Sequence, residues 1–438
     1  MSHVFRSDAH DRAVGHAMRG ERIAAWWGAG AIACYRRGAT YHHDTRAWGD
    51  AAPEELDEAI RWAADRWRVK PAYSPGSLAR RLAQRLGAHG HPIEDRHAAT
   101  LLHDATAAGR IQVIRPGRHA LAHSWDLRRA YLHEMTGSLP VGLPTPHGPE
   151  AMVRVAERGE RWGVAMADVD LAPQGARQDI GCLPVRTYHE GDRVLCYPPR
   201  GHARGAWTLT DLRLARELGC DVRLGYGVSW PMAEIPWCRR FARIIADSAE
   251  EHPCLKILAA AAVGTWAQSG RKRRCVWADS EEERRRIMRA NAPGHPLALG
   301  HLVAYLEPVA RRPPWSAPAR AAAVWAAARA RLLRGMVAVG APIAVATDGI
   351  LAIPGRAPSP VGPEPGQWRR EPDLHGLEIA GANHWRARTP DGEEVYRASG
   401  IEEARAGAWL QGRLFQPPPS LARECRVDSE GRNHVSWE

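Results

Sequence analysis

Asp348 is the lone charged residue in IAVATDGILAIP, residues 343 to 354 of this 438-residue chain. Asp-Gly between two β-prone apolar runs predicts a hairpin turn, because glycine tolerates the positive φ that such turns need. A tight hairpin would also hold the Asp348 carboxylate at a sheet edge, where it could bind a divalent metal together with a second carboxylate. The sequence leaves both interpretations open, and the second requires a partner.

The best candidate for that partner is Asp126, in SWDLRRAYLHEM at residues 124 to 135. Asp126 ends a short segment that then becomes helical, and an aromatic side chain follows at Tyr131. An ordinary helix N-cap is the alternative role for Asp126, since aspartate accepts hydrogen bonds from the exposed amides of a first turn. For Tyr131 the alternative is a core position on an amphipathic helix.

Lys256 is one of very few lysines in a chain whose other cations are arginines. The segment LKILAAAAVGTWAQ, residues 255 to 268, places Lys256, Ala260 and Gly264 at helical spacing. A cation at one end of a helix face made of small residues could bind a triphosphate, and the small residues would leave room for a base pair against the helix. A packed alanine-rich helix with one solvated lysine is the alternative.

The elements that must position these residues predict an α+β fold. Helical patterns cover residues 53 to 67, 77 to 86, 209 to 219 and 317 to 335, and strand-like runs cover 109 to 114, 193 to 198 and 343 to 347. Proline and glycine cluster at 137 to 149 and 354 to 366, and we expect loops or boundaries there.

Composition favours a polyanionic partner. The formal net charge is +11, and cationic side chains that neutralise phosphates release counterions. Eight cysteines without a Cys-x-x-Cys pair suggest neither a zinc ribbon nor a dense disulfide frame, and they suit a reducing cytoplasm. The polar N-terminus and the short apolar run at 257 to 264 predict a soluble, unprocessed protein without a membrane span.

Together, these segments resemble the polymerase motifs of family B DNA polymerases, and most closely those of the protein-primed branch found in phages and linear plasmids. The resemblance covers roughly residues 75 to 415. The first motif, Asp-x-x-Ser-Leu-Tyr-Pro, is matched at Asp126 and Tyr131, whereas Arg129, Ala130 and Leu132 depart from it.

The other two motifs are matched in part. In the second, Lys-x-x-x-Asn-Ser-x-Tyr-Gly, the matches are Lys256 and Gly264 and the departures are Ala260, Ala261 and Val263. In the third, Tyr-x-Asp-Thr-Asp-Ser, the matches are Thr347 and Asp348 and the departures are Ala344, Ala346 and Gly349. The flanks resemble the family too: TAAGRIQV (106 to 113) resembles its Tyr-x-Gly-Gly turn, and Asn383 and Trp385 occupy the places of a Lys-x-Tyr motif. Segment 207 to 222 resembles the family's segment between the first two motifs, and segment 318 to 333 resembles the helix that leads into the third.

The resemblance implies a DNA polymerase that adds deoxynucleoside triphosphates to a primer on a template. It assigns Asp126 and Asp348 to metal binding and catalysis, with Mg²⁺ as the cofactor and Mn²⁺ as a substitute. It assigns the following residues to the nucleotide: Tyr131 as a steric gate, Lys256 and one of Arg239, Arg240 and Arg243 at the triphosphate, and Ala260 and Gly264 at the base pair. It assigns the following residues to primer-template DNA: Gly109, Arg110, Thr347, Asn383 and Trp385.

The implied architecture is a right hand. We expect a reduced N-terminal domain (1 to 95), a palm in two parts (96 to 205, with an insertion from 138, and 276 to 365), fingers (206 to 275) and a thumb (366 to 438). The first hundred residues lack the Asp-x-Glu of the family's exonuclease, which predicts no proofreading. A terminal or priming protein is a further candidate partner, in the cytoplasm of a bacterial or phage-infected cell.

Two other interpretations remain open. A degenerate polymerase-like protein that only binds nucleic acid would explain Ala346, Ala260 and Asn383, although both aspartates and Lys256 are retained. A reverse transcriptase is the third interpretation, and it fits less well because those enzymes carry paired aspartates where this chain has Ala346, Thr347 and Asp348.

Overall fold

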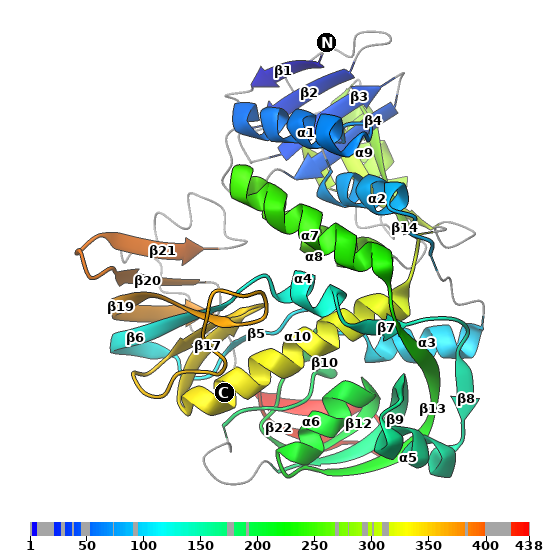
Figure 1. Ribbon diagram of the computed structural model, residues 1–438, viewed down its shortest axis with the longest axis vertical. Helices are drawn as coiled ribbons and strands as arrows, with labels where there is room; N and C mark the ends of the chain where they lie inside the picture. The colour runs from blue at the N-terminus through cyan, green and yellow to red at the C-terminus, as the bar shows by residue number, and fades with distance from the viewer. Residues whose placement is uncertain are drawn as a thin grey trace. The chain divides into compact units, whose positions relative to one another are not determined.

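The computed structural model describes residues 2–6, 22–27, 31–36, 39–44, 53–72, 74–90, 95–172, 179–189, 192–267, 271–278, 280–290, 297–299, 302–308, 315–381, 384–398 and 422–437. The chain forms two compact units (Figure 1). The first unit comprises Met1–Pro92 and Pro236–Pro318, and the second comprises Ile93–Ile235 and Ala319–Glu438. Within the described part, no helix is both long and apolar enough to cross a membrane.

The first unit combines a sheet with a group of helices. Its sheet has the order β1-β2-β3-β4-β14-β16-β15, with bounds β1 Ser2–Arg6, β2 Arg22–Trp27, β3 Ala31–Arg36, β4 Ala39–Asp44, β14 Arg271–Trp277, β15 Leu297–Leu299 and β16 Leu302–Pro308. Its helices are α1 Pro53–Trp67, α2 Pro75–Arg85, α7 Pro236–Glu251, the 3₁₀ helix η3 Pro253–Ile257, α8 Leu258–Trp266 and α9 Glu281–Ala290.

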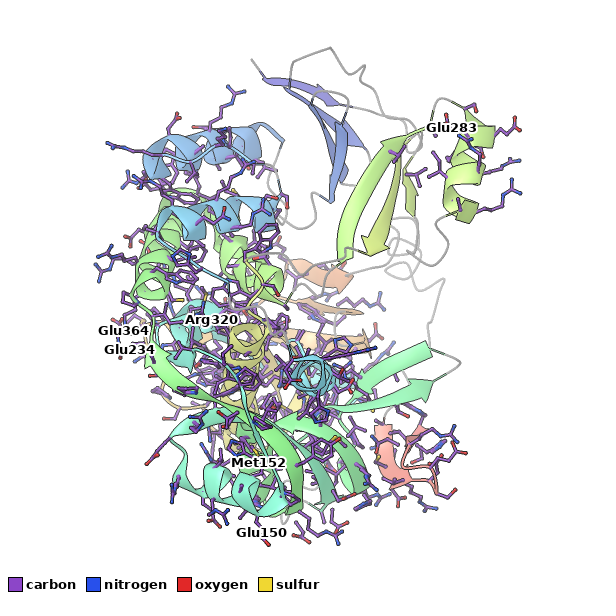
Figure 2. All side chains as sticks on the ribbon, turned by 90° about the vertical axis from the view of Figure 1, so that its right-hand side faces the viewer. Glu150, Met152, Glu234, Glu283, Arg320 and Glu364 are labelled. Atoms are coloured by element: carbon purple, nitrogen blue, oxygen red, sulfur yellow. The ribbon has the colours of Figure 1, made fainter. Side chains whose placement is uncertain are left out.

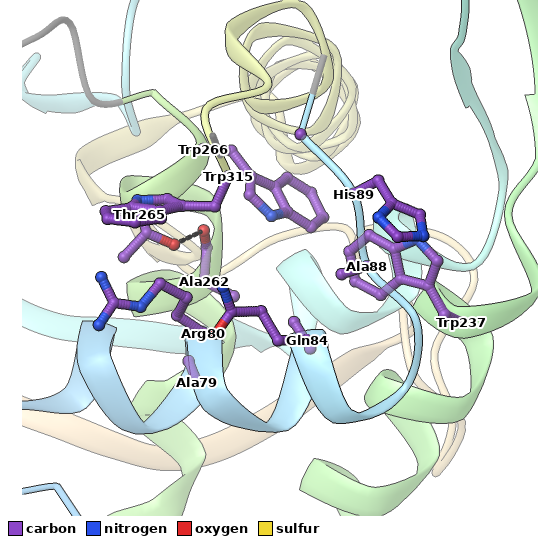
Figure 3. Close-up of a pocket in the computed structure, with 12 residues that line it drawn as sticks. Ala79, Arg80, Gln84, Ala88, His89, Trp237, Ala262, Thr265, Trp266 and Trp315 are labelled. Carbon is purple, nitrogen blue, oxygen red and sulfur yellow. Dashed lines mark hydrogen bonds between the residues drawn. The ribbon is translucent and has the colours of Figure 1, made fainter. Parts of the chain in front are cut away.

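Helix α2 shows how local sequence builds this unit. Ser74 caps it by accepting a hydrogen bond from the Ser77 N–H, and Pro75 occupies the first turn, where its missing N–H costs nothing. Leu78 and Leu82, four residues apart, are buried on the face that packs against α8. Tryptophans from α7, α8 and the segment before α10 close a small pocket beside α2, where the Arg80 guanidinium lies 4.2 Å from the centre of the Trp315 ring (Figure 3).

The second unit holds two larger sheets among its described residues. One, which we call the aspartate sheet, has the order β21-β20-β19-β6-β18-β17-β5, with bounds β5 Ile111–Val113, β6 Gly117–Leu127, β17 Pro342–Ala346, β18 Gly349–Ala352, β19 Trp368–Gly381, β20 His384–Arg388 and β21 Glu394–Ala398. The other has the order β23-β22-β12-β9-β13-β7, with β8 also paired to β13, and bounds β7 Ser138–Pro140, β8 Thr145–His147, β9 Arg161–Leu171, β12 Arg200–Thr208, β13 Asp221–Glu234, β22 Ala422–Val427 and β23 Asn433–Trp437. The remaining elements are the hairpin β10 Val185–His189 and β11 Asp192–Cys196, and helices α3 Arg96–Ala105, α4 Ala130–Met135, α5 Pro149–Arg158, α6 Leu209–Glu217 and α10 Pro318–Val339.

Helix α10 joins the two sheets of the second unit through one apolar core (Figure 1). Its Leu332 and Met336 share a cluster with Trp368 of the aspartate sheet and Trp207 of the other sheet. Gly335 allows this packing, because a Cβ there would lie 2.4 Å from the Trp368 ring. In the same cluster, Met152 of α5 is fully buried (Figure 2) and fills the space beside Gly163 and Gly227 of the second sheet.

The predicted elements agree with the structure where local patterns decide. The mixed α+β class is confirmed, and the helix predicted at 53 to 67 is α1. The loop predicted at 137 to 149 is wrong in part, because β7 and β8 pair there with β13.

The predicted domain boundaries differ from the two units. Strands β15 and β16, expected in the palm, pair in the sheet of the first unit, and β13, expected in the fingers, lies in the second unit. Strand β19, expected in the thumb, pairs with β6 in the aspartate sheet. These pairings join segments far apart in the chain, so no local pattern announces them.

Candidate active site

Strand pairing brings Asp126 and Asp348 close together. Asp126, near the end of β6, is in register with Gly349 of β18, and the Leu127 N–H donates a 2.8 Å hydrogen bond to the Asp348 carbonyl. Paired Cα atoms in antiparallel strands lie about 4.5 to 5.5 Å apart and successive ones 3.8 Å apart, so these two aspartate Cα atoms lie within about 9 Å of each other. Both side chains are partly exposed. The partner that Asp348 requires for metal binding is therefore available at the neighbouring strand.

The β17–β18 hairpin differs from the predicted Asp-Gly turn. The positive φ, 59°, belongs to Thr347, and Gly349 is the first residue of β18. The Asp348 N–H donates a 2.7 Å hydrogen bond to the Ala346 carbonyl across Thr347, which is the bond of a γ-turn. A β-branched residue is strained in this region, and such strain gathers at functional sites.

Tyr131 and Gly109 pack against the hairpin tip. A Cβ added to Gly109 would lie 2.9 Å from the Thr347 methyl and 3.1 Å from the Tyr131 hydroxyl, so only glycine fits here without movement. Burial and then the nearby Asp348 charge raise the pKa of Tyr131 to about 12. The phenol therefore stays protonated at neutral pH. The Tyr131 side chain is partly exposed, and its hydroxyl lies beside the Gly109 turn.

Asp126 is not a helix cap. Helix α4 begins after Arg129, which has a left-handed φ of 50°, and no side chain caps it. Asp126 lies three residues earlier, in β6, and pairs with the Arg369 guanidinium at 3.4 Å. The N-cap alternative is therefore wrong, because the strand continues through Asp126 before the chain turns into α4.

A buried ion pair supports the turn that carries Gly109. Arg329 of α10 contacts Asp211 of α6 at 2.7 Å, with each side chain about 95% buried. Arg329 also donates to the carbonyls of Ala107 and Ala108. Burial lowers the pKa of Arg329, but the charge and hydrogen bond of Asp211 together with Tyr197 and Tyr131 outweigh burial, so the net shift is upward. The sequence analysis did not select either residue. Two patterns could have indicated them: the helix cap Thr208-x-x-Asp211 and an arginine within an alanine-rich helix.

Arg110 holds the hairpin from within the core. Its carbonyl accepts a 2.7 Å hydrogen bond from the Thr347 N–H. The residue is 2% exposed, and its guanidinium donates to Gly181 and Gln112 and lies 4.2 Å from the Tyr197 ring centre. Burial lowers the pKa of Arg110 to about 10. The donors of this side chain are therefore occupied inside the protein, and the placement of Arg110 at the DNA stays a prediction.

The residues expected at the nucleotide triphosphate lie in the first unit. Lys256 is exposed in η3, ahead of α8, so the predicted continuous helical face from Lys256 to Gly264 is interrupted. Gly264 is exposed with open space around it, and Ala260 is half-buried. The arginines of α7 expected at the triphosphate are all exposed: Arg239, Arg240 and Arg243.

Of the Lys-x-Tyr match, Asn383 lies outside the described residues. Trp385 of β20 is half-buried, in register with Ile379, and packs on the apolar cluster of the aspartate sheet. The indole of Trp385 therefore has a structural role in this sheet.

The carboxylate oxygens of Asp126 and Asp348 are suitable ligands for a hard divalent cation such as Mg²⁺. The described residues contain no group of three or more His, Cys, Asp or Glu side chains that could cage a metal. Mg²⁺ does not require one, because it is bound by one or two carboxylates together with waters and substrate phosphates. Asp126 and Asp348 would be those carboxylates.

Comparisons of sequence find no relative: no family model and no curated protein matches the chain. Comparison of structure does. Phi29 DNA polymerase, complexed with primer-template DNA and incoming nucleotide, aligns with a TM-score of 0.64 at 10% identity, over 98% of this chain and 86% of that chain. The chain has the fold of phi29 DNA polymerase.

Two further structures of phi29 DNA polymerase agree. Its complex with primer-template DNA aligns with a TM-score of 0.63 at 12% identity, over 98% of this chain and 86% of that chain. Its complex with single-stranded DNA aligns with a TM-score of 0.60 at 11% identity, over 90% of this chain and 80% of that chain. The resemblance to protein-primed family B polymerases is thus confirmed as a likeness to the phi29 polymerase fold. At this identity, activity must be argued from the residues.

Proposed function

We propose that this protein is a template-directed DNA polymerase that adds deoxynucleotides to a primer 3′-hydroxyl. The observation that carries the proposal is the placement of Asp126 on β6 next to Asp348, in the turn before the paired strand β18, beside Tyr131 and the Gly109 turn, in a chain with the phi29 polymerase fold. Nucleotidyl transfer needs such a carboxylate pair to hold divalent cations between the primer end and the triphosphate.

The two aspartates would hold Mg²⁺, or Mn²⁺ in its place. The chemistry that the bound cation supplies is charge neutralisation at the phosphates and a lower pKa of the attacking hydroxyl. Asp348 is fixed for this role by the γ-turn and by the Leu127 N–H on its carbonyl. Asp126 is fixed by its place in the interior of the aspartate sheet, between β18 and β19.

Tyr131 would select the sugar. Its hydroxyl packs on the Gly109 turn, and its raised pKa keeps it neutral, so it would exclude a ribose 2′-hydroxyl by shape. Gly109 and Thr347, which pack against each other at the hairpin tip, would approach the primer-template. Lys256 and an α7 arginine would bind the triphosphate, consistent with the net charge of +11.

The departures from the motifs predict reduced discrimination. Ala260, Ala261 and Val263 supply no polar or aromatic group to a base-pair pocket, so we expect frequent misinsertion. The missing Asp-x-Glu predicts that mistakes are not removed. Misinsertion rates as low as those of ordinary family members would contradict the first expectation, and degradation of a 3′-labelled single strand would contradict the second.

Primer extension tests the proposal. Wild-type protein should extend a DNA primer on a DNA template with Mg²⁺ or Mn²⁺. Asp126→Asn and Asp348→Asn should each lower the rate at least about 100-fold, because a metal-binding carboxylate contributes several kcal/mol at the transition state. Asp373→Asn is the matched control, since Asp373 is a partly exposed carboxylate of the same sheet that pairs with Arg370 instead.

The second candidate is a nucleic-acid-binding protein without catalysis. Ala346, where the family carries another aspartate, favours it. In that case the wild type, Asp126→Asn and Asp348→Asn would bind primer-template with equal affinity. None of the three would extend the primer with Mg²⁺ or Mn²⁺. Extension by the wild type that both substitutions abolish would exclude it.

A further inference from the structure

Arg369 places a fixed cation beside one of the two aspartates. In β19 it is in register with Asp126, and its Nη2 lies 3.4 Å from Asp126 Oδ2. The same nitrogen contacts the Glu371 carboxylate, two residues along the same strand and therefore on the same face. About half of the Arg369 side chain is exposed. Glu371 thus holds the guanidinium at the edge of the proposed metal site.

The other neighbouring strand adds no side chain opposite Asp126. The residue in register with Asp126 on the opposite neighbour, β18, is Gly349, which has no side chain. Within this row of the sheet, the side-chain charge placed opposite Asp126 therefore comes from Arg369 of β19. A divalent cation approaching Asp126 meets a positive charge that Glu371 keeps in place.

Arg370, the next residue, is arranged differently. It contacts Asp373 at 2.6 Å and lies 4.9 Å from the centre of the Trp125 ring. Successive side chains of a strand point to opposite faces, so the Arg370 guanidinium, which has the same charge as Arg369, lies on the face away from Asp126. The two arginines therefore form a matched pair in which only Arg369 contacts the aspartate.

We propose that Arg369 makes metal binding at Asp126 depend on the nucleotide. This inference rests on the proposed function. A metal ion alone binds against the repulsion of Arg369 and in competition with its ion pair. A triphosphate that arrives with the metal supplies negative charge to both cations, and the planar guanidinium matches phosphate oxygens as well as a carboxylate. The repulsion is then offset, and metal and nucleotide bind together.

The test is Mn²⁺ binding to the full-length protein, followed by electron paramagnetic resonance of the free ion, with and without a deoxynucleoside triphosphate and in the absence of DNA. Arg369→Gln should bind Mn²⁺ alone about 5 to 20 times more tightly than wild type, because an opposed charge and a competing half-exposed ion pair are removed. Arg370→Gln should match wild type within twofold. Adding the nucleotide should strengthen Mn²⁺ binding more in wild type than in Arg369→Gln.

A second variant and a site control keep the result decisive. Arg369→Thr also removes the charge and suits a strand, so it replaces Arg369→Gln if that variant fails to fold. Asp126→Asn combined with Arg369→Gln should lose the gained affinity. Equal Mn²⁺ affinities in wild type and both Arg369 variants would overturn the inference and leave the proposed function standing. No Mn²⁺ binding by any form, even with nucleotide, would overturn both.

Discussion

Gly109→Ala tests whether the packing of Gly109, Tyr131 and Thr347 sets the geometry of the site. The new Cβ would lie 2.9 Å from Thr347 Cγ2 and 3.1 Å from the Tyr131 hydroxyl, against an ordinary contact of 3.4 Å or more. Thr347 must therefore move by about 0.5 Å, and it carries the strained turn beside Asp348. Overpacking of this size costs about 1 to 3 kcal/mol.

We expect two measurable effects of Gly109→Ala. The melting temperature should fall by about 2 to 10 °C, which is the shift expected when about 1 to 3 kcal/mol of stability is lost from a unit of this size. The kcat/KM for single-nucleotide insertion should fall about 10- to 100-fold, because a displacement of this order misplaces reacting groups. Differential scanning fluorimetry and insertion kinetics measure the two effects.

The matched control for Gly109→Ala is Gly137→Ala. Gly137 lies in the same unit, and a Cβ there would come no closer than 3.7 Å to the Glu134 carbonyl oxygen. Thr347→Ser removes the methyl nearest to the new Cβ, so the Gly109→Ala/Thr347→Ser double variant should recover most of the lost activity. If Gly109→Ala behaves like Gly137→Ala, or if Thr347→Ser brings no recovery, the steric argument is wrong.

Three other substitutions have defined outcomes. Tyr131→Val should lower discrimination against ribonucleotides about 10- to 100-fold, measured as a ratio of kcat/KM values, and unchanged discrimination would remove Tyr131 from the sugar site. Asp211→Asn should destabilise the second unit by about 3 kcal/mol in urea unfolding, because it leaves the buried Arg329 charge unpaired; adding Arg329→Met should reduce that loss, and a stable single variant would contradict the role of the pair. Gly335→Ala should lower the melting temperature by several degrees, because its Cβ would meet the Trp368 ring at 2.4 Å, and an unaltered melting curve would show that the indole moves freely.

The sequence by itself determined the features that depend on neighbouring residues. Helix α1 has the bounds that its pattern predicts, and α6 begins at the predicted residue, behind the Thr208 cap, because apolar spacing and capping act within one or two turns. The apolar runs around Asp348 likewise predict the hairpin. The resemblance then selected Asp126 from the chain's many carboxylates, and strand pairing brings Asp126 next to Asp348.

Tertiary structure alone decided which distant residues meet. The contact between Arg369 and Asp126 spans 243 residues, and the contact between Arg329 and Asp211 spans 118, so neither follows from a local pattern. The burial of Arg110 and the left-handed φ of Thr347 also come from packing, since isolated segments would expose the first and avoid the second. Backbone hydrogen bonding makes strands pair but does not specify which strands, and that choice depends on the core that they bury together.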